Sequence, residues 1–342
     1  MPTIDSARLE AKATRIFTAM GAPAGDAAWI AALLVRANLR GHDSHGVIRI
    51  PQYWESVKRK EVDPRSPITV TAETPALVRL DGGRGFGQVV ARRAMEMAIA
   101  KAQAGGLSAA STSRTSHVGR LADYAEMAAD AGLVGLLWAN CVHGLNVAPW
   151  GGAARRLGTN PHAVAIPGSS GPAMVLDFAT SVVAEGKLRV KRNRKQPAPP
   201  GWFVDSKGRP ETDPEIFYGD PPGALLTAGD HKGYGLSLAV EILGGILSGT
   251  GPAGPPPGVF ANGTLMICLD VERFLPLADF HRQVAALFGW VKATPLAQNA
   301  SEILIPGEPE ARLEAERRAH GITVEDQTWN QIETTAAELG VA

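Results

Sequence analysis

The opening part of the chain alternates apolar and polar positions with the period of an amphipathic helix. Between residues 4 and 20 the apolar side chains recur at helical spacing, which predicts a first helix. A break at residues 22–26 follows, and Asp26 is a candidate cap for a second helix that runs to about Leu39. Residues 47–57 form a third amphipathic stretch. The pattern therefore predicts a helical N-terminal part.

Beyond residue 67 strand-like and helix-like segments alternate. Strands are predicted at 68–72, 76–80, 107–111, 133–138, 163–166, 173–176, 263–269 and 302–305. Helices are predicted at 86–103, 118–131, 236–247, 277–290, 308–320 and 329–339. In one of these helices the adjacent glycines Gly244 and Gly245 indicate that another backbone packs closely there. The alternation predicts a layered α/β protein.

Two segments are typical of loops. The basic run Lys187–Lys195 predicts a solvated surface loop. The segment Ser248–Gly258 is rich in glycine and proline, and Gly249, Gly251 and Gly254 formally match G-x-G-x-x-G. The dinucleotide-binding fingerprint needs a strand before it and a helix after it, whereas this match follows a helix and contains proline. We interpret it as a plain loop, so a bound nicotinamide cofactor would not use a conventional Rossmann turn.

Composition narrows the function classes. A length of 342 residues favours two domains, or one large domain with an insertion. The 34 basic residues balance the 34 acidic ones, which disfavours a nucleic-acid partner. No apolar run approaches the roughly 20 residues that span a bilayer, and no signal segment opens the chain. Cys141 and Cys268 form neither a disulfide framework nor a zinc-site spacing. We expect a cytoplasmic protein without a membrane partner.

The polar turn at residues 41–46 is the first candidate site. His45 follows Ser44, and Arg49 comes four residues later, so His45 and Arg49 project to one side if a helix begins just after the turn. An imidazole exchanges protons near neutral pH, and a guanidinium binds a carboxylate with two hydrogen bonds. Together they could bind a small carboxylate and protonate the oxygen beside it. A solvated, capped turn is the alternative, and a zinc pair with His42 lacks an evident third ligand.

Four further polar clusters follow. Arg114–Arg120 comes after a strand and before a helix, where backbone N–H groups attract phosphate, although a simple helix cap is the alternative. Leu157–Pro161 is a tight turn, and Leu176–Ser181 is a strand end with an acid and two hydroxyls. Asp230–Gly235 is a glycine-rich turn in which Lys232 could meet a phosphate. Each cluster alone is weak evidence for a function, but the order of the clusters along the chain points to a family.

That order resembles the malate/L-lactate dehydrogenase family, whose fold is not a Rossmann fold. The matching segments are Leu39–Tyr53, Thr115–Leu121, Ala148–Gly152, Leu157–Pro161, Leu176–Ser181, Lys232–Gly235 and Ile305–Glu308. They cover nearly the whole chain. Four segments, Ala37–Leu39, Gly41–Gly46, Phe86–Gln88 and Trp290–Ala293, are similar to the hydroxycarboxylate dehydrogenase B type.

The resemblance implies a fold and an assembly. The fold would be the α/β, L-sulfolactate dehydrogenase-like type. Residues 1–66 would form a helical substrate-site part, and residues 67–260 a central NAD(P)-binding domain with a largely antiparallel sheet. Residues 261–342 would return to the N-terminal helices. Members of the family are homodimers or larger, with the site near the subunit boundary.

The resemblance also implies the interconversion of a 2-oxo acid and a 2-hydroxy acid with NAD or NADP; it names neither the acid nor the preferred cofactor. His45 would be the acid/base with Ser44 as its hydrogen-bonding neighbour, while in some members the counterpart of His117 accepts the proton. Arg49 and Thr159 would contact the substrate. The cofactor contacts would be His117, Gly119, Asn140, Asp177, Ala179, Lys232, Pro306, Gly307 and Glu308, the last three at the adenosine end. No metal is implied.

Other activities stay open. The family includes ureidoglycolate dehydrogenases and cyclic imine carboxylate reductases, which act on piperideine- or pyrroline-2-carboxylate. The imine reductases carry an acid at the position of Lys187, so a lysine there favours oxo acids. A sensor that keeps the fold without turnover is a further class. The presence of Ser44, His45, Arg49 and His117 together favours an enzyme.

The chain departs from the family at a few positions. Arg114–Thr115 stands where many members have Gly-Asn, and His162 stands where many have an apolar residue. Some relatives lack an arginine at the position of Arg49. Arg120 or Arg189 is therefore an alternative cation for the substrate carboxylate.

Overall fold

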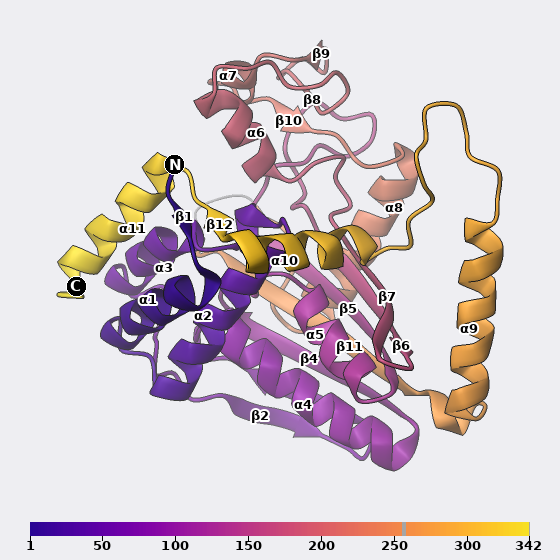
Figure 1. The fold of residues 1–342 in the computed structure, drawn as a ribbon. Helices are drawn as coiled ribbons and strands as arrows, with labels where there is room; N and C mark the ends of the chain where they lie inside the picture. Colours follow the sequence, from indigo (N-terminus) through magenta and orange to yellow (C-terminus); the bar gives the residue numbers. More distant parts are fainter. Residues whose placement is uncertain (255–257, 342) are drawn as a thin grey trace.

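A mixed α/β fold is built around a seven-stranded sheet in the computed structural model, which describes residues 1–254 and 258–341 (Figure 1). In spatial order the strands are β2 (Thr69–Glu73), β3 (Leu77–Asp81), β4 (Leu107–Thr115), β11 (Ala261–Asp270), β5 (Leu133–Val142), β6 (His162–Gly168) and β7 (Gly171–Phe178). Only β3 and β4 pair in parallel; the other neighbours are antiparallel. The expected α/β class with a largely antiparallel sheet is confirmed.

Helices cover both faces of this sheet. On one face α4 (Gly87–Gly105) and α5 (Ala122–Asp130) pack their buried alanines against the strands, and small side chains let helix and sheet approach closely. On the other face α8 (His231–Val240) continues into a π-helical turn, η2 (Glu241–Ile246). A Cβ added to Gly244 would lie 2.9 Å from the backbone nitrogen of Asn140. The close approach expected at this glycine pair is therefore confirmed.

The N-terminal helices form a second core with the end of the chain. The elements are α1 (Ser6–Ala19), α2 (Ala24–Leu39), α3 (Arg49–Lys58), α10 (Glu308–His320), α11 (Asp326–Glu338) and the paired strands β1 (Thr3–Ile4) and β12 (Ile322–Thr323). Asp26 was expected to cap α2, and this prediction is wrong. The helix already begins at Ala24, after Pro23. Since β11 lies in the centre of the sheet, the segment 261–342 serves both cores; its status as a separate part stays a prediction.

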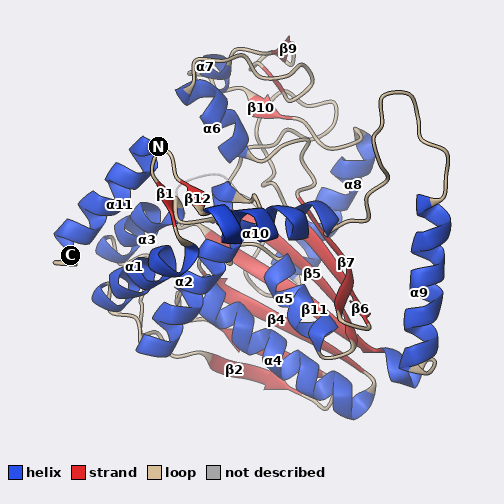
Figure 2. Cartoon of the chain, viewed as in Figure 1, coloured by secondary structure: helices blue, strands red, loops and turns tan. Residues whose placement is uncertain are grey.

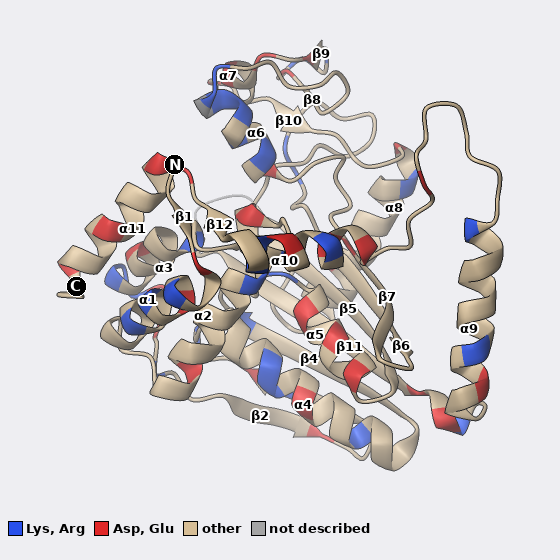
Figure 3. Ribbon diagram, in the orientation of Figure 1, with Lys and Arg blue, Asp and Glu red and all other residues tan. Residues whose placement is uncertain are grey.

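The basic run Lys187–Lys195 is not a surface loop. Most of it belongs to α6 (Glu185–Asn193), which packs with α7 (Pro214–Phe217) in a small lobe (Figure 1). The lobe also holds the short strands β8 (Phe203–Val204), β9 (Pro210–Glu211) and β10 (Ala224–Leu225). The prediction failed because the charges hid one apolar anchor: Leu188 is completely buried against the lobe's core. Figure 3 shows basic residues along α6.

Three further expectations are corrected. Residues 302–305 do not form a strand; beside them only one backbone bond joins β7, from the Val175 nitrogen to the Pro306 carbonyl at 3.0 Å, and Pro306 has no N–H to extend a ladder. The helix expected from residue 118 begins at Ala122, so residues 118–121 separate His117 from its start. The helix expected from residue 236 begins at His231.

Two peripheral features complete the description. The helix α9 (Leu277–Lys292) stands apart from the body of the molecule and contains no buried residue (Figure 2). Residues 255–257 of the predicted loop Ser248–Gly258 lie outside the described residues. In the part of the chain that is described, no helix combines the length and the apolar character needed to cross a membrane.

Candidate active site

Two histidines from distant parts of the chain meet in one place. His45 ends the short 3-10 helix η1 (Asp43–His45), which connects α2 and α3, and His117 lies between β4 and α5. Their rings stack with centroids 5.5 Å apart and an interplanar angle of 23°. The Ser44 hydroxyl oxygen lies 3.0 Å from Nδ1 of His45. The structure thus brings together the three side chains that we had expected to perform catalysis.

His45 is neutral in this environment. Burial is the main cause, and the charge of Arg49 is the next, of a pKa lowered to about 3. A neutral imidazole can accept a proton at neutral pH. An anion bound to Arg49 would offset the positive charge beside the ring and so raise the pKa of His45. The acid/base strength of His45 therefore depends on whether a carboxylate occupies the site.

Arg49 is the cation best placed to receive that carboxylate. It opens α3; its Nε donates to the Ser44 carbonyl at 2.6 Å and its Nη1 to Gln52 Oε1 at 2.6 Å. Within residues 1–254 and 258–341 no carboxylate forms an ion pair with Arg49, and the charge of Glu185 acts on it only without such a contact. By contrast, Arg120 is paired with two acids of α5, and Arg189 is paired with Glu185.

A large cavity opens beside these residues. Its volume is about 1500 Å³, which exceeds the roughly 300–1,000 Å³ of a pocket for one small ligand. The predicted site residues on its wall are Ser44, His45, Arg49, Gly119, Thr159, Asp177 and Ala179. Lys187 of α6 also lines it. The cavity is therefore bounded by the N-terminal helices, the end of the sheet and the basic helix of the small lobe.

Asp177 places a carboxyl group on the cavity wall at the end of β7. Its Oδ2 accepts a hydrogen bond of 2.8 Å from the Ala122 nitrogen at the start of α5. Burial raises the pKa of Asp177 to about 6, although the charge of Arg120 opposes this effect. Thr159 lies nearby, and its carbonyl accepts bonds from the nitrogen and hydroxyl of Thr180.

Other predicted cofactor residues lie away from this wall. Asn140 is completely buried: its Nδ2 donates to the Gly251 carbonyl at 2.9 Å, and its Oδ1 accepts from the Gly263 nitrogen at 2.9 Å. Its side chain therefore holds β5, β11 and the segment after η2 together. Lys232 is exposed in the first turn of α8.

The segment Pro306–Glu308 runs beside β7. A Cβ added to Gly307, whose φ is +99°, would lie 3.1 Å from the Val175 side chain. The Glu308 carboxylate accepts a 2.9 Å bond from the Ile305 nitrogen and pairs with Lys292. The contacts with Lys292 and with the Ile305 nitrogen lower the pKa of Glu308, and they outweigh burial, which would raise it. The carboxylate is thus engaged in holding the start of α10.

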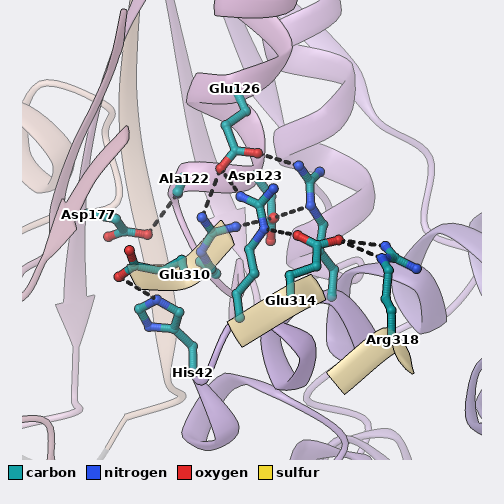
Figure 4. A network of polar contacts seen from close by, with 11 residues as sticks. His42, Ala122, Asp123, Glu126, Asp177, Glu310, Glu314 and Arg318 are labelled. Carbon is teal, nitrogen blue, oxygen red and sulfur yellow. Dashed lines mark hydrogen bonds and ion pairs between the residues drawn. The ribbon is translucent and has the colours of Figure 1, made fainter. Parts of the chain in front are cut away.

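A network of ion pairs ties α10 to α2 and α5, and Arg40 and Arg120 of this network also line the cavity (Figure 4). The Glu126 carboxylate of α5, almost completely buried, binds Arg36, Arg40 and Arg120. Arg40 also binds Glu314 of α10 at 2.6 Å. Buried charges are stable only when paired in this way, so the network fixes the three helices relative to each other.

His42 stands at the edge of this network. Its Nε2 lies 3.7 Å from a carboxylate oxygen of Glu310 (Figure 4). Burial, followed by the charge of Arg120, lowers the pKa of His42 to about 4. Across the described ranges, no group of three or more His, Cys, Asp or Glu side chains could hold a metal ion.

Sequence reasoning missed two residues of the site. The Tyr53 hydroxyl lies 2.7 Å from Nδ1 of His117, and the Gln88 amide nitrogen donates to the same hydroxyl at 2.8 Å. Tyr53 comes four residues after Arg49 on α3, so helical spacing could have placed it on the same face. Gln88 belongs to the segment Phe86–Gln88 that carries part of the resemblance, but the sequence assigned it no role, because that role depends on its contact with Tyr53 of α3.

Comparisons with known proteins identify the family of the chain. Residues 4–333 match the family described as malate/L-lactate dehydrogenase. Hydroxycarboxylate dehydrogenase B of Escherichia coli is 36% identical, over 98% of this chain and 94% of that protein. L-sulfolactate dehydrogenase of Methanocaldococcus jannaschii is also 36% identical, over 94% and 92% respectively. The solved structure of malate dehydrogenase from Pyrococcus horikoshii has a TM-score of 0.91 at 33% identity, covering 100% of this chain and 96% of that one. The chain therefore belongs to the malate/L-lactate dehydrogenase family, as the order of its motifs predicted.

Proposed function

We propose that the protein is an NAD(P)-dependent dehydrogenase that interconverts a 2-oxo acid and a 2-hydroxy acid. Membership of the family supports an oxidoreductase that acts on a CH–OH group. The observation that carries the proposal is the guanidinium of Arg49, which forms no ion pair with a described carboxylate, beside the neutral imidazole of His45 in one cavity. A 2-hydroxy acid presents a carboxylate and a hydroxyl on adjacent carbons, and these two side chains match both groups.

Arg49 would orient the substrate. A guanidinium binds a carboxylate with two parallel hydrogen bonds, which fixes both position and plane. Two N–H groups of Arg49 are already held by the Ser44 carbonyl and by Gln52, so the side chain is preorganised. Fixing the carboxylate also fixes the neighbouring carbon, and with it the face that reacts.

His45 would move the proton. Because Nδ1 faces the Ser44 hydroxyl, Nε2 is the nitrogen that remains for the substrate oxygen. In oxidation the neutral ring takes the hydroxyl proton, and in reduction the protonated ring returns it. The substrate carboxylate on Arg49 raises the pKa of His45, which makes the ring a better base once the site is filled.

The residues on the cavity wall fit a nicotinamide cofactor. The cavity has room for a second molecule beside a small acid, and Gly119, with φ of +81°, and Ala179 carry no bulky side chain that would fill it. We infer that Gly119, Asp177 and Ala179 contact the cofactor, and that Asn140 supports this wall from within. Lys232 and the segment Pro306–Glu308 would serve its phosphate and adenosine end. When bound, a nicotinamide supplies or accepts the hydride.

A panel of substrates tests the proposal. Pyruvate, oxaloacetate, sulfopyruvate and piperideine-2-carboxylate would each be combined with NADH and with NADPH, and the absorbance at 340 nm followed. We expect turnover with at least one oxo acid and a preference for one cofactor. Absence of turnover with every oxo acid, in a protein that still binds the cofactor, would contradict the proposal. Turnover of the cyclic imine alone would establish the alternative activity.

We also propose that the protein is a cytoplasmic homodimer. The support is apolar surface in two places: Leu238, Ile242 and Ile246 on α8 and η2, and Leu287 and Trp290 on α9, are exposed. Large exposed apolar side chains gathered on neighbouring elements are typical of an interface. Light scattering on the purified protein would give the mass directly, and a monomer of 35.9 kDa would contradict the dimer.

A further inference from the structure

A chain of polar contacts leads from the protein interior to the two stacked histidines. Gln88 of α4 donates from Nε2 to the Tyr53 hydroxyl at 2.8 Å, and that hydroxyl lies 2.7 Å from Nδ1 of His117. The other face of the site is closed by His45, whose Nδ1 lies 3.0 Å from Ser44 Oγ. Each histidine thus has its Nδ1 occupied by a hydroxyl of this chain.

With the Gln88 amide nitrogen toward Tyr53, and its Oε1 buried without a partner among the described residues, the direction of these bonds points to the nitrogen of His117 that carries the proton. The Tyr53 oxygen already accepts the amide N–H of Gln88, and a phenol has a single proton to give. That proton points to the remaining neighbour, which is Nδ1 of His117. A nitrogen that accepts a hydrogen bond carries no proton, so the neutral ring holds its proton on Nε2.

Tyr53 is well fixed for this task. Only 4% of its surface is exposed, and its ring packs against Phe17 and Phe86 with centroids 6.2 Å and 6.0 Å away. Burial raises the pKa of the phenol to about 12, so the folded protein keeps this proton at neutral pH. Gln88 is completely buried, and its amide holds the Tyr53 hydroxyl from the side of α4.

The groups around His117 also keep it neutral. The charged or titratable side chains that act on it are Arg49 and His45, both from the η1–α3 region. On its other side lies the apolar ring of Phe260, with a centroid 6.2 Å away. Burial, followed by the charge of Arg49, places the pKa of His117 well below its usual value.

We propose that Tyr53, oriented by Gln88, is a positioning residue that holds His117 as a neutral hydrogen-bond donor through Nε2. The inference rests on the proposed function only in assigning His117 to the reaction. It separates the roles of the two histidines: His45 exchanges the proton, and His117 presents a fixed N–H to the oxygen or amide of a bound molecule. Ser44 holds the His45 ring and Tyr53 holds the His117 ring, each through Nδ1.

The tautomer can be measured directly. In the full-length protein with ¹⁵N-labelled histidine, the His117 signals are identified by their loss in His117→Gln. We expect an unprotonated Nδ1 and a protonated Nε2. In Tyr53→Phe we expect both tautomers, and a titration of His117 shifted upward by roughly half to one pH unit, because the bond that favoured the neutral ring is gone. The kcat of this variant should fall roughly tenfold while the KM for the oxo acid changes little.

Two further variants keep the test sharp. Tyr124→Phe removes another buried phenol, whose hydroxyl donates to the Val118 carbonyl beside His117 without contacting the imidazole; it should leave the tautomer unchanged. Gln88→Leu keeps the Tyr53 hydroxyl but frees its direction, so mixed tautomers are expected there too. If Tyr53→Phe fails to fold, the tautomer of His117 in Gln88→Leu provides the test instead.

A wild-type His117 with its proton on Nδ1, or an unchanged tautomer in both Tyr53→Phe and Gln88→Leu, would overturn the inference. The spectra are recorded without substrate, so they do not depend on turnover. Failure of every oxo acid in the substrate panel would instead reject the proposed function and leave the tautomer result standing.

Discussion

Gly186 lies directly against Ser44. A Cβ added to Gly186, in the first turn of α6, would come within 2.7 Å of the Ser44 Cβ. The small lobe therefore touches the loop that carries His45, and the basic helix becomes part of the cavity wall for this reason. A segment with the composition of a surface loop is thus joined to the candidate active site by one glycine.

This contact predicts the effect of Gly186→Ala. The methyl group has no room unless Ser44 moves, and Ser44 orients the His45 ring. Since a displacement of about 1 Å in a reacting group costs up to 10²-fold in rate, we expect kcat to fall roughly 10–100-fold with little change in thermal stability. Gly25→Ala, where nothing lies within 4 Å of the new Cβ, is the matched control in steady-state kinetics. Equal rates in both variants would refute the coupling.

His45→Ala should abolish turnover and leave the cofactor bound. General acid–base catalysis contributes typically about 10²–10⁴-fold, and we expect a loss of that size in kcat. Cofactor affinity, measured by fluorescence titration, should stay within a few-fold of wild type. A variant that keeps a near-normal rate would transfer the acid/base role to His117.

Arg49→Lys should be nearly as harmful as Arg49→Met. Lysine keeps the charge but loses the planar pair of donors, so the carboxylate is held without a fixed orientation. The loss should appear in kcat/KM for the oxo acid, by roughly 10²-fold, while cofactor affinity changes little. Arg189→Met, which removes a guanidinium already paired with Glu185, is the control. If Arg189→Met shows the larger loss, the carboxylate binds there instead.

The raised pKa of Asp177 makes the stability of the folded protein depend on pH. Its pKa rises from 3.8 to about 6 on folding, so the folded state favours the protonated form. This contribution to stability is full below about pH 4 and is lost as the pH rises through about 6. Asp177→Asn should therefore raise the free energy of unfolding at pH 8 by roughly 1–3 kcal/mol and change it little at pH 4. Denaturant titrations at both pH values measure this.

Asp279→Asn, at the exposed start of α9, is the control for removal of a negative charge. A gain of equal size in both variants, or a gain for Asp177→Asn that does not depend on pH, would show that the buried carboxyl is not its source.

Most local elements and the family could be predicted from the sequence alone. All seven strands of the main sheet were predicted, because alternating apolar residues bounded by turns depend only on neighbours in the chain. The same holds for α10, whose predicted bounds agree with the structure. The ordered motifs identified the family, and the turn at residues 41–46 supplied Ser44 and His45 as candidates, with Arg49 close behind.

Which of these elements and side chains meet depends on the tertiary structure. The insertion of β11 between β4 and β5, the stacking of His117 on His45 and the bond from Gln88 to Tyr53 all join segments that are far apart in the chain. The folding of α6 against the cavity depends on one buried leucine among charges. Local periodicity reports which side of an element is buried, but not its partner. The partner is chosen by packing among all elements at once, which no single stretch of sequence contains.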